Sequence, residues 1–278
     1  MTTDHVPQDA SVATLLDDDL LAALRGFAAL PRLLVCLDFD GCVSELVADA
    51  SEARPVPANA EAIRRLAGLD GVRVAYVSGR PLESLRELAA PPSGALLIGS
   101  HGAERDVADL APQGAGLTLT PGQQAARREL LEVFESIAAG TEGAWVEHKP
   151  AGAAIHVRKI PDAGEAKQVL VESRAAVATL DEVHPKEGKM VLEAVVVQAD
   201  KGEGISELRR LVSPDAVLFA GDDVTDEFGF AVLAGEDLGV KVGEGETRAA
   251  HRIEAPAQLA AVLNTIAEAR EAREEEQQ

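Results

Sequence analysis

An apolar run that ends in two aspartates constrains this sequence most. The five apolar residues 33–37 are followed directly by Asp38, Phe39, Asp40 and Gly41. A run of this length is typical of a strand buried on both faces of a parallel sheet, and functional groups gather at the carboxyl ends of such strands. The strand period of two allows both carboxylates to face one side, and Gly41 permits a sharp turn beside them. The run therefore predicts a central strand with polar chemistry at its end.

The two carboxylates of this motif need a positive partner. Side by side, Asp38 and Asp40 repel each other unless a proton or a cation intervenes. Mg²⁺, a hard cation that prefers oxygen ligands, is the simplest candidate. The alternative is a strand followed by an ordinary turn, since Asp and Gly are common turn residues.

A second strand-and-acid pattern lies near the other end of the chain. The apolar run 216–220 is followed by Gly221 and by an acidic segment that contains Asp222, Asp223 and Asp226. If both strands belong to one parallel sheet, their carboxyl ends meet although they are far apart in the sequence. This repetition favours a functional site over two unrelated turns.

Two other segments offer groups that suit a phosphate. A strand-like run ends in Ser78, Gly79 and Arg80, which supply a hydroxyl, backbone N–H groups and a guanidinium. Lys201 precedes an expected helix, where its ammonium reaches an anion as a point charge. For Arg80 we favour a structural or hinge role, because an arginine near a helix start often pairs with surface carboxylates.

In the order DFDG, SGR, DKG and GDDVTDE, these segments resemble the motifs of the haloacid dehalogenase superfamily of phosphohydrolases. The resemblance implies that Asp38 is a nucleophile that becomes an aspartyl-phosphate and that Asp40 is the general acid and base. It also implies that Mg²⁺ is bound by Asp38, the backbone carbonyl of Asp40 and Asp222. Asp223 and Asp226 would contribute directly, through water or through the other ligands.

The same resemblance assigns the groups that bind phosphate. Ser78, Gly79 and Lys201 would hold the phosphoryl oxygens and neutralise the charge that develops on them. Because a sugar alkoxide is a poor leaving group, the reaction needs a positioned acid, and Asp40 would supply it.

Alternating patterns place these motifs in a doubly wound α/β core with a mostly parallel, Rossmann-like sheet. Helical periodicity over 15–30 precedes the first strand, and helices expected over 58–67 and 81–88 alternate with the strands that follow. From residue 106 to residue 197 the pattern changes to two helices and four short strands. This change indicates an inserted α+β cap, which is expected to determine substrate specificity.

These patterns divide the chain into four parts, and the glutamate-rich end is expected to be solvated. The parts are a disordered N-terminus at 1–12, a haloacid-dehalogenase-like core at 13–105 and 198–270, the cap at 106–197, and a frayed C-terminal tail at 271–278.

Four further segments lie in and beside the expected cap: SHGAE at 100–104, VEHK at 146–149, IHVR at 155–158 and GKMVLE at 188–193. Together they resemble the motif set of trehalose-6-phosphate phosphatases. By this resemblance Glu147, Lys149 and Glu193 bind hydroxyls of the sugar ring distal to the phosphate, a task that suits charge-assisted hydrogen bonds. Arg158 is assigned to the substrate as well, with the alternative that it and His156 form only the polar side of the cap.

The other cap residues also have structural alternatives. Glu147 and Lys149 occupy alternate positions of one strand, where an exposed ion pair would explain them without a ligand. Glu193 interrupts an apolar strand at a position where burial is expected, which favours a functional role. Trp145, the single tryptophan of the chain, is interpreted as cap core, with sugar stacking as the alternative.

The charge of the chain limits its partners. A net charge of −21, from 26 basic and 47 acidic residues, opposes binding to nucleic acid or to an anionic membrane surface. No segment approaches the roughly 20 apolar residues of a membrane-spanning helix. We therefore expect a cytoplasmic protein that acts on a small-molecule substrate as a monomer or weak dimer.

Together these features predict a Mg²⁺-dependent phosphatase that hydrolyses trehalose 6-phosphate to trehalose and phosphate. Within the enzymes, the alternative is another capped sugar-phosphate phosphatase or a phosphomutase, of the sucrose-phosphate or mannosyl-3-phosphoglycerate type. Outside the enzymes, the alternative is a sugar-phosphate sensor or a regulatory partner of a trehalose-phosphate synthase. The presence of every expected catalytic position argues against this last alternative.

Overall fold

The computed structural model describes residues 16–277, except 108–109, 111–116 and 118. The N-terminal segment 1–12, expected to be disordered, lies outside the described residues. The described residues of Met1–Gly102, Asp106–Gln113 and Asp200–Gln278 form one compact unit, and those of Ala103–Arg105 and Gly114–Ala199 form a second. We refer to these as the core unit and the cap unit.

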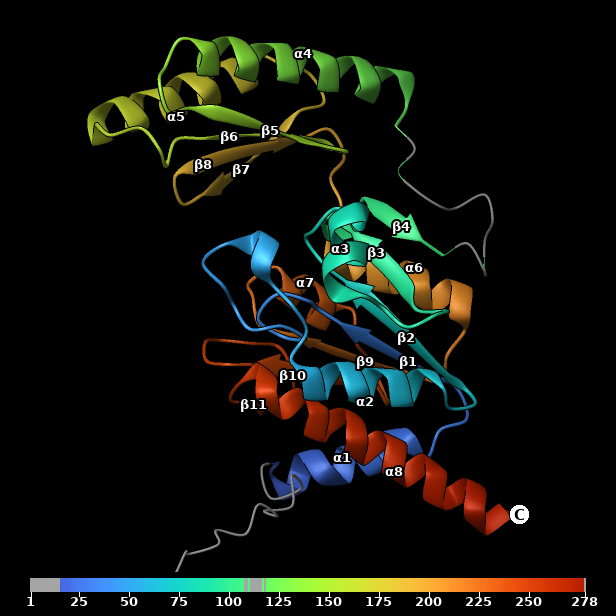
Figure 1. Ribbon diagram of the computed structural model, residues 1–278. Coiled ribbons are helices and arrows are strands. Elements are labelled where there is room, and N and C mark those ends of the chain that lie inside the picture. The colour runs from blue at the N-terminus through green and yellow to red at the C-terminus, as the bar shows by residue number, and fades with distance from the viewer. Residues whose placement is uncertain (1–15, 108–109, 111–116, 118, 278) are drawn as a thin grey trace, which may run out of the picture. The chain divides into compact units, whose positions relative to one another are not determined.

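A seven-stranded sheet forms the centre of the core unit, with the strand order β11-β10-β9-β1-β2-β3-β4 (Figure 1). All pairings from β11 to β3 are parallel. The strands are β1 (Leu33–Leu37), β2 (Val72–Val77), β3 (Leu96–Gly99), β4 (Glu104–Asp106), β9 (Ala216–Gly221), β10 (Leu238–Val242) and β11 (His251–Ile253). The helices are α1 (Asp18–Ala28), α2 (Pro57–Ala67), α3 (Leu82–Ala89), α6 (Lys201–Val212), α7 (Asp226–Ala231) and α8 (Leu259–Gln277), with short 3-10 turns η2 (Ala50–Glu52), η3 (Ser100–Gly102) and η4 (Pro256–Gln258).

Helices cover both faces of this sheet. Apolar side chains of α1, α2, α3 and α8 pack against one face, and those of α6 and α7 pack against the other. Every residue of β1 and β9 is buried, as expected for central strands between two helical layers. Each fully buried leucine of β1 stabilises the fold by about 1.5–3 kcal/mol relative to exposure. Strand β1 pairs with β9 on one side and with β2 on the other, and this strand order positions the site.

The cap unit is an antiparallel sheet with helices on one face. Its strand order is β5-β6-β8-β7. Ile155 and Leu192 point into a hydrophobic cluster with the two helices, whereas the alternate positions Glu147, Ala154 and Glu193 share the opposite face. The elements are α4 (Pro121–Ala139), β5 (Trp145–Lys149), β6 (Gly152–His156), α5 (Ala163–Val177), β7 (His184–Gly188) and β8 (Val191–Val195).

Local sequence signals explain where several helices begin. At Thr120 a capping box forms with Gln123, followed by Pro121 at the first helical position of α4. Aspartate side chains accept backbone N–H groups at the starts of three further helices. These are Asp17 for α1, Asp162 for α5 and Asp200 for α6.

The fold class expected from the sequence is confirmed: the core is a mostly parallel α/β sheet, and the inserted segment has mixed helices and strands. The three-residue strands β4 and β11 were not predicted, because such short segments carry no periodicity. Helix α8 continues to Gln277, so the segment expected as a frayed tail from residue 271 is helical up to that residue. Helix α7 begins at Asp226, whose carboxylate accepts a hydrogen bond from the N–H of Asp223 and holds the preceding turn.

Candidate active site

The site of the core unit forms where three neighbouring parallel strands end. Strand β1 leads into Asp38, β2 into Ser78 and β9 into Asp222. Because β1 lies between the other two strands, Asp38 is the central residue among these three strand ends. The Asp38 N–H donates to the Ala220 carbonyl at 2.9 Å, which extends the β9 pairing to the start of the motif. The expectation that distant strand ends meet is therefore fulfilled for these residues.

A buried lysine links two of the carboxylates. Lys201 Nζ lies 2.8 Å from Asp38 Oδ1 and 2.6 Å from Asp226 Oδ1, and the three side chains are 3%, 5% and 0% exposed. The lysine is the first residue of α6, which packs closely at this end. A Cβ atom on Gly202 would collide with the Phe228 carbonyl, so only glycine allows the approach.

The charges of this cluster shift one another's protonation. Burial raises the pKa of Asp38 well above its ordinary value, and Lys201 opposes this shift while Asp226 and Asp222 add to it. For Lys201, burial lowers the pKa, but the two carboxylates outweigh burial and leave the pKa above its ordinary value. One ammonium thus faces several carboxylates, and the cluster is short of positive charge.

Asp222 identifies where further positive charge would bind. Burial, followed by the charges of Asp226 and Asp223, raises the pKa of Asp222 to about 6. Its Oδ1 atom is buried without a hydrogen-bond partner among the described residues. A side chain at Gly41, where φ is +76°, would collide with the Asp222 carboxylate, so glycine keeps room for that group. Sequence reasoning missed Lys241, a buried lysine on β10 whose ammonium donates to the Asp222 carbonyl oxygen.

Three carboxylates could hold a metal ion here. Asp38, Asp222 and Asp226 each offer an oxygen, and these atoms lie within 4.8 Å of one another. A donor set made only of carboxylate oxygens, one of them buried and unpaired, suits a hard divalent cation. The residues therefore fit the hard-cation site expected from the sequence.

The other two aspartates assigned to the metal take different positions. Asp223 presents its backbone N–H to Asp226 Oδ2 at 2.8 Å, and its carboxylate accepts the Thr225 hydroxyl at 3.2 Å. The side chain of Asp40 lies outside the three-carboxylate cluster, since both its oxygens are bound by Arg80. Each residue would therefore support the cluster through its backbone or through a neighbour.

The pair between Asp40 and Arg80 was not anticipated from the sequence. Arg80 Nε lies 2.6 Å from Asp40 Oδ2, and Arg80 Nη2 lies 2.6 Å from Asp40 Oδ1. The guanidinium also lies over the Phe39 ring, 5.3 Å from its centroid. Such a bidentate pair fixes the direction of the carboxylate as well as its charge. The sequence feature that could have predicted the pair is that Arg80 follows β2 and Asp40 follows the neighbouring strand β1.

Ser78 and Gly79 lie beside this pair. Ser78 is buried, and its Oγ accepts the Arg80 N–H at 3.2 Å. The ring of His101 covers Gly79, because a Cβ atom there would lie 2.5 Å from His101 Cε1. His101 has a φ of +58°, which is uncommon for a residue other than glycine, and its N–H donates to the Ser78 carbonyl at 3.0 Å.

The cap residues predicted to bind sugar form their own group on the face of the cap sheet opposite its two helices. Lys149 Nζ lies 2.7 Å from Glu193 Oε2 across the small residues of β6. Glu147 Oε2 lies 2.9 Å from His156 Nε2. Arg158 is exposed beyond the end of β6 and takes no part in these pairs. The structure thus brings three of the four predicted sugar ligands onto one face.

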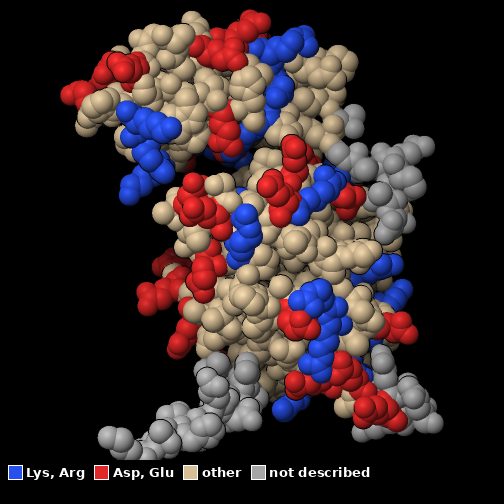
Figure 2. Space-filling model, viewed as in Figure 1, with Lys and Arg blue, Asp and Glu red and all other residues tan. Residues whose placement is uncertain are grey.

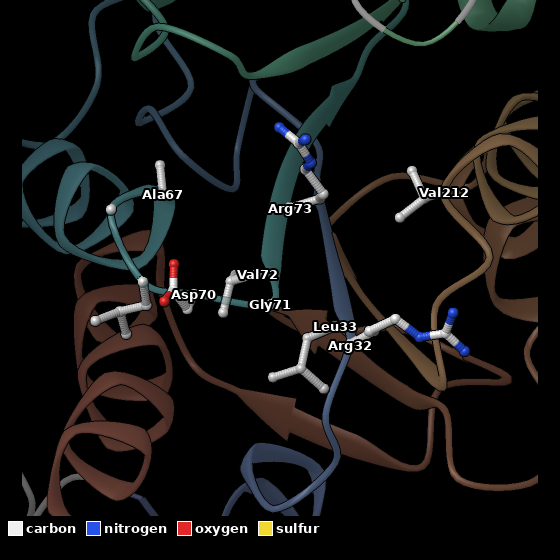
Figure 3. A pocket seen from close by; sticks show the side chains of 10 residues that line it. Arg32, Leu33, Ala67, Asp70, Gly71, Val72, Arg73 and Val212 are labelled. Carbon is white, nitrogen blue, oxygen red and sulfur yellow. The ribbon is translucent and has the colours of Figure 1, made fainter. Parts of the chain in front are cut away.

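A cavity of about 410 Å³ lies at the other end of the strands, beside the amino-terminal ends of β1 and β2 (Figure 3). Its charged lining residues include Arg32, Asp70 and Arg73. Figure 3 shows the two guanidinium groups pointing in different directions. Ligand sites usually present convergent polar groups, so the strand-end cluster is the better candidate.

Comparison with known proteins identifies the family. The trehalose-phosphatase family model matches residues 36–261, most of the chain. The chain belongs to the trehalose-phosphatase family. This confirms the resemblance found in the motifs.

Individual relatives support this membership. A trehalose-phosphate phosphatase of Mycobacterium marinum is 30% identical over 257 residues, which cover 85% of this chain and 62% of that protein. An uncharacterised glycosyl hydrolase of Mycobacterium tuberculosis strain H37Rv is 30% identical over 284 residues, covering 93% of this chain. The chain spans only 20% of the length of that second relative. The C-terminal domain of a C. albicans trehalose-6-phosphate phosphatase has the same fold, with a TM-score of 0.69 at 21% identity, covering 90% of this chain and 95% of that one.

The distribution of surface charge does not point to a particular partner. Basic and acidic side chains are interspersed over the face seen in Figure 2. Within the part of the chain that the structure describes, no helix has the length and apolar character to cross a membrane. The expected cytoplasmic location, the absence of a nucleic-acid partner and the monomeric or weakly dimeric state stay predictions.

Proposed function

We propose that this chain hydrolyses trehalose 6-phosphate to trehalose and inorganic phosphate, with Asp38 as the nucleophile and Mg²⁺ as the cofactor. The observation that carries the proposal is the buried cluster of Lys201 with Asp38 and Asp226, beside the unpaired Asp222 oxygen. In a chain of the trehalose-phosphatase family, this cluster suits a phosphoryl group, whose charge the site must neutralise.

In the first step a carboxylate oxygen of Asp38 forms a bond to phosphorus while the bond from phosphorus to the sugar oxygen breaks. Asp40 gives its proton to the departing sugar oxygen. In the second step Asp40 takes a proton from water as that water attacks phosphorus, which releases phosphate and regenerates the Asp38 carboxylate. Because Asp40 is bound by Arg80, its carboxylate must leave this pair, at least in part, before it can carry the proton.

Lys201, Ser78 and Gly79 would bind the phosphoryl oxygens during both steps. Lys201 already faces Asp38, so its ammonium lies where charge develops as the new bond forms. Asp38, Asp222 and the backbone carbonyl of Asp40 would hold Mg²⁺, as would Asp226, which the structure places in the same cluster. When bound, the cation would neutralise the charge of the phosphoryl group.

The cap would recognise the sugar. Glu147, Lys149 and Glu193 lie on one face and offer both donors and acceptors, which matches the mixed hydrogen bonding of sugar hydroxyls. Arg158 stays a proposed contributor from the end of β6. Family membership favours trehalose 6-phosphate over the sucrose-phosphate and mannosyl-3-phosphoglycerate alternatives.

The test is phosphate release with Mg²⁺ from trehalose 6-phosphate, compared with glucose 6-phosphate, sucrose 6-phosphate and mannosyl-3-phosphoglycerate. Selective release from trehalose 6-phosphate is expected, and the Asp38→Asn variant should release none. Equal release from all four substrates would retain the phosphatase but reject the cap assignment. No release from any of them would reject the enzyme and favour the sugar-phosphate sensor.

A further inference from the structure

The cap carries an aromatic contact that no part of the proposed reaction uses. The rings of Trp145 and His156 are stacked, with centroids 4.6 Å apart and planes 5° from parallel. The two residues face each other across β5 and β6. Lys159 Nζ lies over the same indole, 4.9 Å from its centroid. Trp145 thus joins two neighbouring segments of the cap.

Trp145 does not belong to the hydrophobic core of the cap, contrary to its interpretation from the sequence. The cluster under α4 and α5 includes its neighbours Ala144 and Val146 but not the indole. Alternation along β5 places Trp145 on the same face as Glu147 and Lys149. A large, half-buried aromatic ring on the polar face is not needed to fill the core, so another role has to explain it.

The stack fixes the direction of one hydrogen bond. His156 Nε2 lies 2.9 Å from Glu147 Oε2. Because an ionised carboxylate only accepts hydrogen bonds, Nε2 carries the hydrogen and donates it. The plane of the imidazole sets where that N–H points, and the parallel indole sets the plane.

Glu147 needs this support more than the other acidic residue of the face. Its side chain is 46% exposed, whereas Glu193 is 21% exposed and is held directly by Lys149. A long exposed side chain samples many rotamers, which weakens any hydrogen bond it makes to a ligand. His156 restricts Glu147, and the second carboxylate oxygen of Glu147 then stays available to a sugar hydroxyl.

Small residues separate the charged groups on this face of the cap sheet. Ala154 lies between Glu147 and Glu193, and Gly152 lies beside Lys149, so the surface between the charged groups carries only small side chains. His156 and Trp145 form the next row on the same face of the sheet. The stack is therefore next to the position where a sugar ring would lie.

We propose that Trp145 is a positioning residue for the sugar, which acts through His156 to hold Glu147 in its binding direction. This inference rests on the proposed function, since it concerns recognition of the sugar in trehalose 6-phosphate. It assigns no chemistry to Trp145, and Trp145 need not touch the substrate.

The first test compares KM for trehalose 6-phosphate in Trp145→Leu and Trp145→Phe. The leucine variant should raise KM about 3- to 10-fold, the range expected for loss of one stacked ring pair, with kcat nearly unchanged. The phenylalanine variant retains a ring and should restore most of the affinity. The matched control is His148→Gln, because His148 pairs with Glu135 at 2.8 Å on the helix-covered face of the same strand and should not alter KM.

The second test asks whether Trp145 acts through Glu147. If it does, adding Trp145→Leu to a Glu147→Ala variant should raise KM no further, because the group being positioned is gone. Independent, multiplicative effects of the two substitutions would overturn the inference. So would an unchanged KM in Trp145→Leu that folds and melts like the wild-type chain.

The third test uses the single tryptophan as its own reporter. In an Asp38→Asn background, titration with trehalose should change the Trp145 emission to saturation, and adding Glu147→Gln should abolish that change. Emission that does not respond, under conditions where calorimetry detects trehalose binding, would overturn the link. These results are distinct from failure of the proposed function, which would appear as a wild-type chain that releases no phosphate from trehalose 6-phosphate.

Discussion

The core and cap units each contain a lysine paired with carboxylates, and the two pairs differ in burial. Lys201 and its partners Asp38 and Asp226 are at most 5% exposed. Lys149 and Glu193 are about one-fifth exposed, at 20% and 21%. The buried group has too few positive charges for its carboxylates, whereas the cap pair is balanced and partly hydrated. Under the proposed function, the buried group would serve phosphate chemistry and the cap pair would serve recognition of the sugar.

Replacement of the two lysines should produce the largest contrast. Lys201→Met leaves Asp38 and Asp226 buried without their cation, so it should abolish turnover and lower the free energy of unfolding by about 3–5 kcal/mol. Lys149→Met should cost at most about 1 kcal/mol and mainly raise KM. Denaturant unfolding with a chelator present measures the change in stability of each variant, and steady-state kinetics measures turnover and KM. Similar losses of stability in the two variants would contradict the distinction drawn from burial.

The pair between Arg80 and Asp40 gives the next largest effect. Arg80→Gln removes the group that directs Asp40, so turnover of trehalose 6-phosphate should fall by about 10²-fold, the lower range for loss of a positioned general acid. An aryl phosphate has a good leaving group and should be affected much less in its first step. The measurement is kcat/KM for both substrates, which reports binding and the first step only, and Arg86→Gln, which breaks the exposed pair with Asp106, is the matched control. Equal losses on both substrates would instead assign Arg80 to phosphate binding.

The pH dependence of metal binding tests the shortage of positive charge in the core. The pKa of Asp222 in the folded chain, about 6, lies above its ordinary value of 3.8. In the metal-free chain, the contribution of the Asp222 carboxyl group to stability is therefore fully present below pH 3.8 and is lost as pH rises through about 6. Mg²⁺ needs the ionised form, so the rise in melting temperature that it causes should grow as pH increases through that range. Asp222→Asn should remove this growth, whereas Asp223→Asn should retain it. A Mg²⁺ effect that does not depend on pH from 5 to 7.5 would reject Asp222 as a ligand.

The smallest expected effect concerns the cap pair. Glu193→Ala should raise KM for trehalose 6-phosphate by about 10-fold, as expected for loss of one hydrogen bond to a charged group. Hydrolysis of a small phosphate ester without a second sugar should be spared. Steady-state kinetics on the two substrates provides the measurement, with Glu187→Ala as the control, since Glu187 pairs with Arg174 on the helix-covered face. Loss of activity on both substrates would remove Glu193 from the sugar site.

Much of the core was predictable because its signals are local. Apolar runs mark β1 and β9, and the segment 72–77, apolar except at Arg73, marks β2. Each is followed by residues that form the site. The lysine at the start of α6 was recognisable from its place before a helix. In contrast, the partner of Arg80 and the role of Lys241 depend on contacts over 40 and 19 positions of the chain.

In the cap, too, the sequence predicted the residues but not their pairings. Glu147, Lys149 and Glu193 were found as a motif, but their pairings follow from the order β5-β6-β8, which places β6 between the two charged strands. Trp145 was assigned to the core because aromatic residues usually fill cores. Only the register of β5 shows that its ring lies on the polar face beside His156.

By itself the sequence determined the buried strands, their polar ends and the family to which the chain belongs, because strand burial and motif order are written in consecutive residues. The tertiary structure decided which charges meet: Lys201 with Asp38 and Asp226, Arg80 with Asp40, and His156 with Glu147. The physical reason is that ion pairs and hydrogen bonds act over about 3 Å, and only the order and register of the strands bring distant residues within that distance.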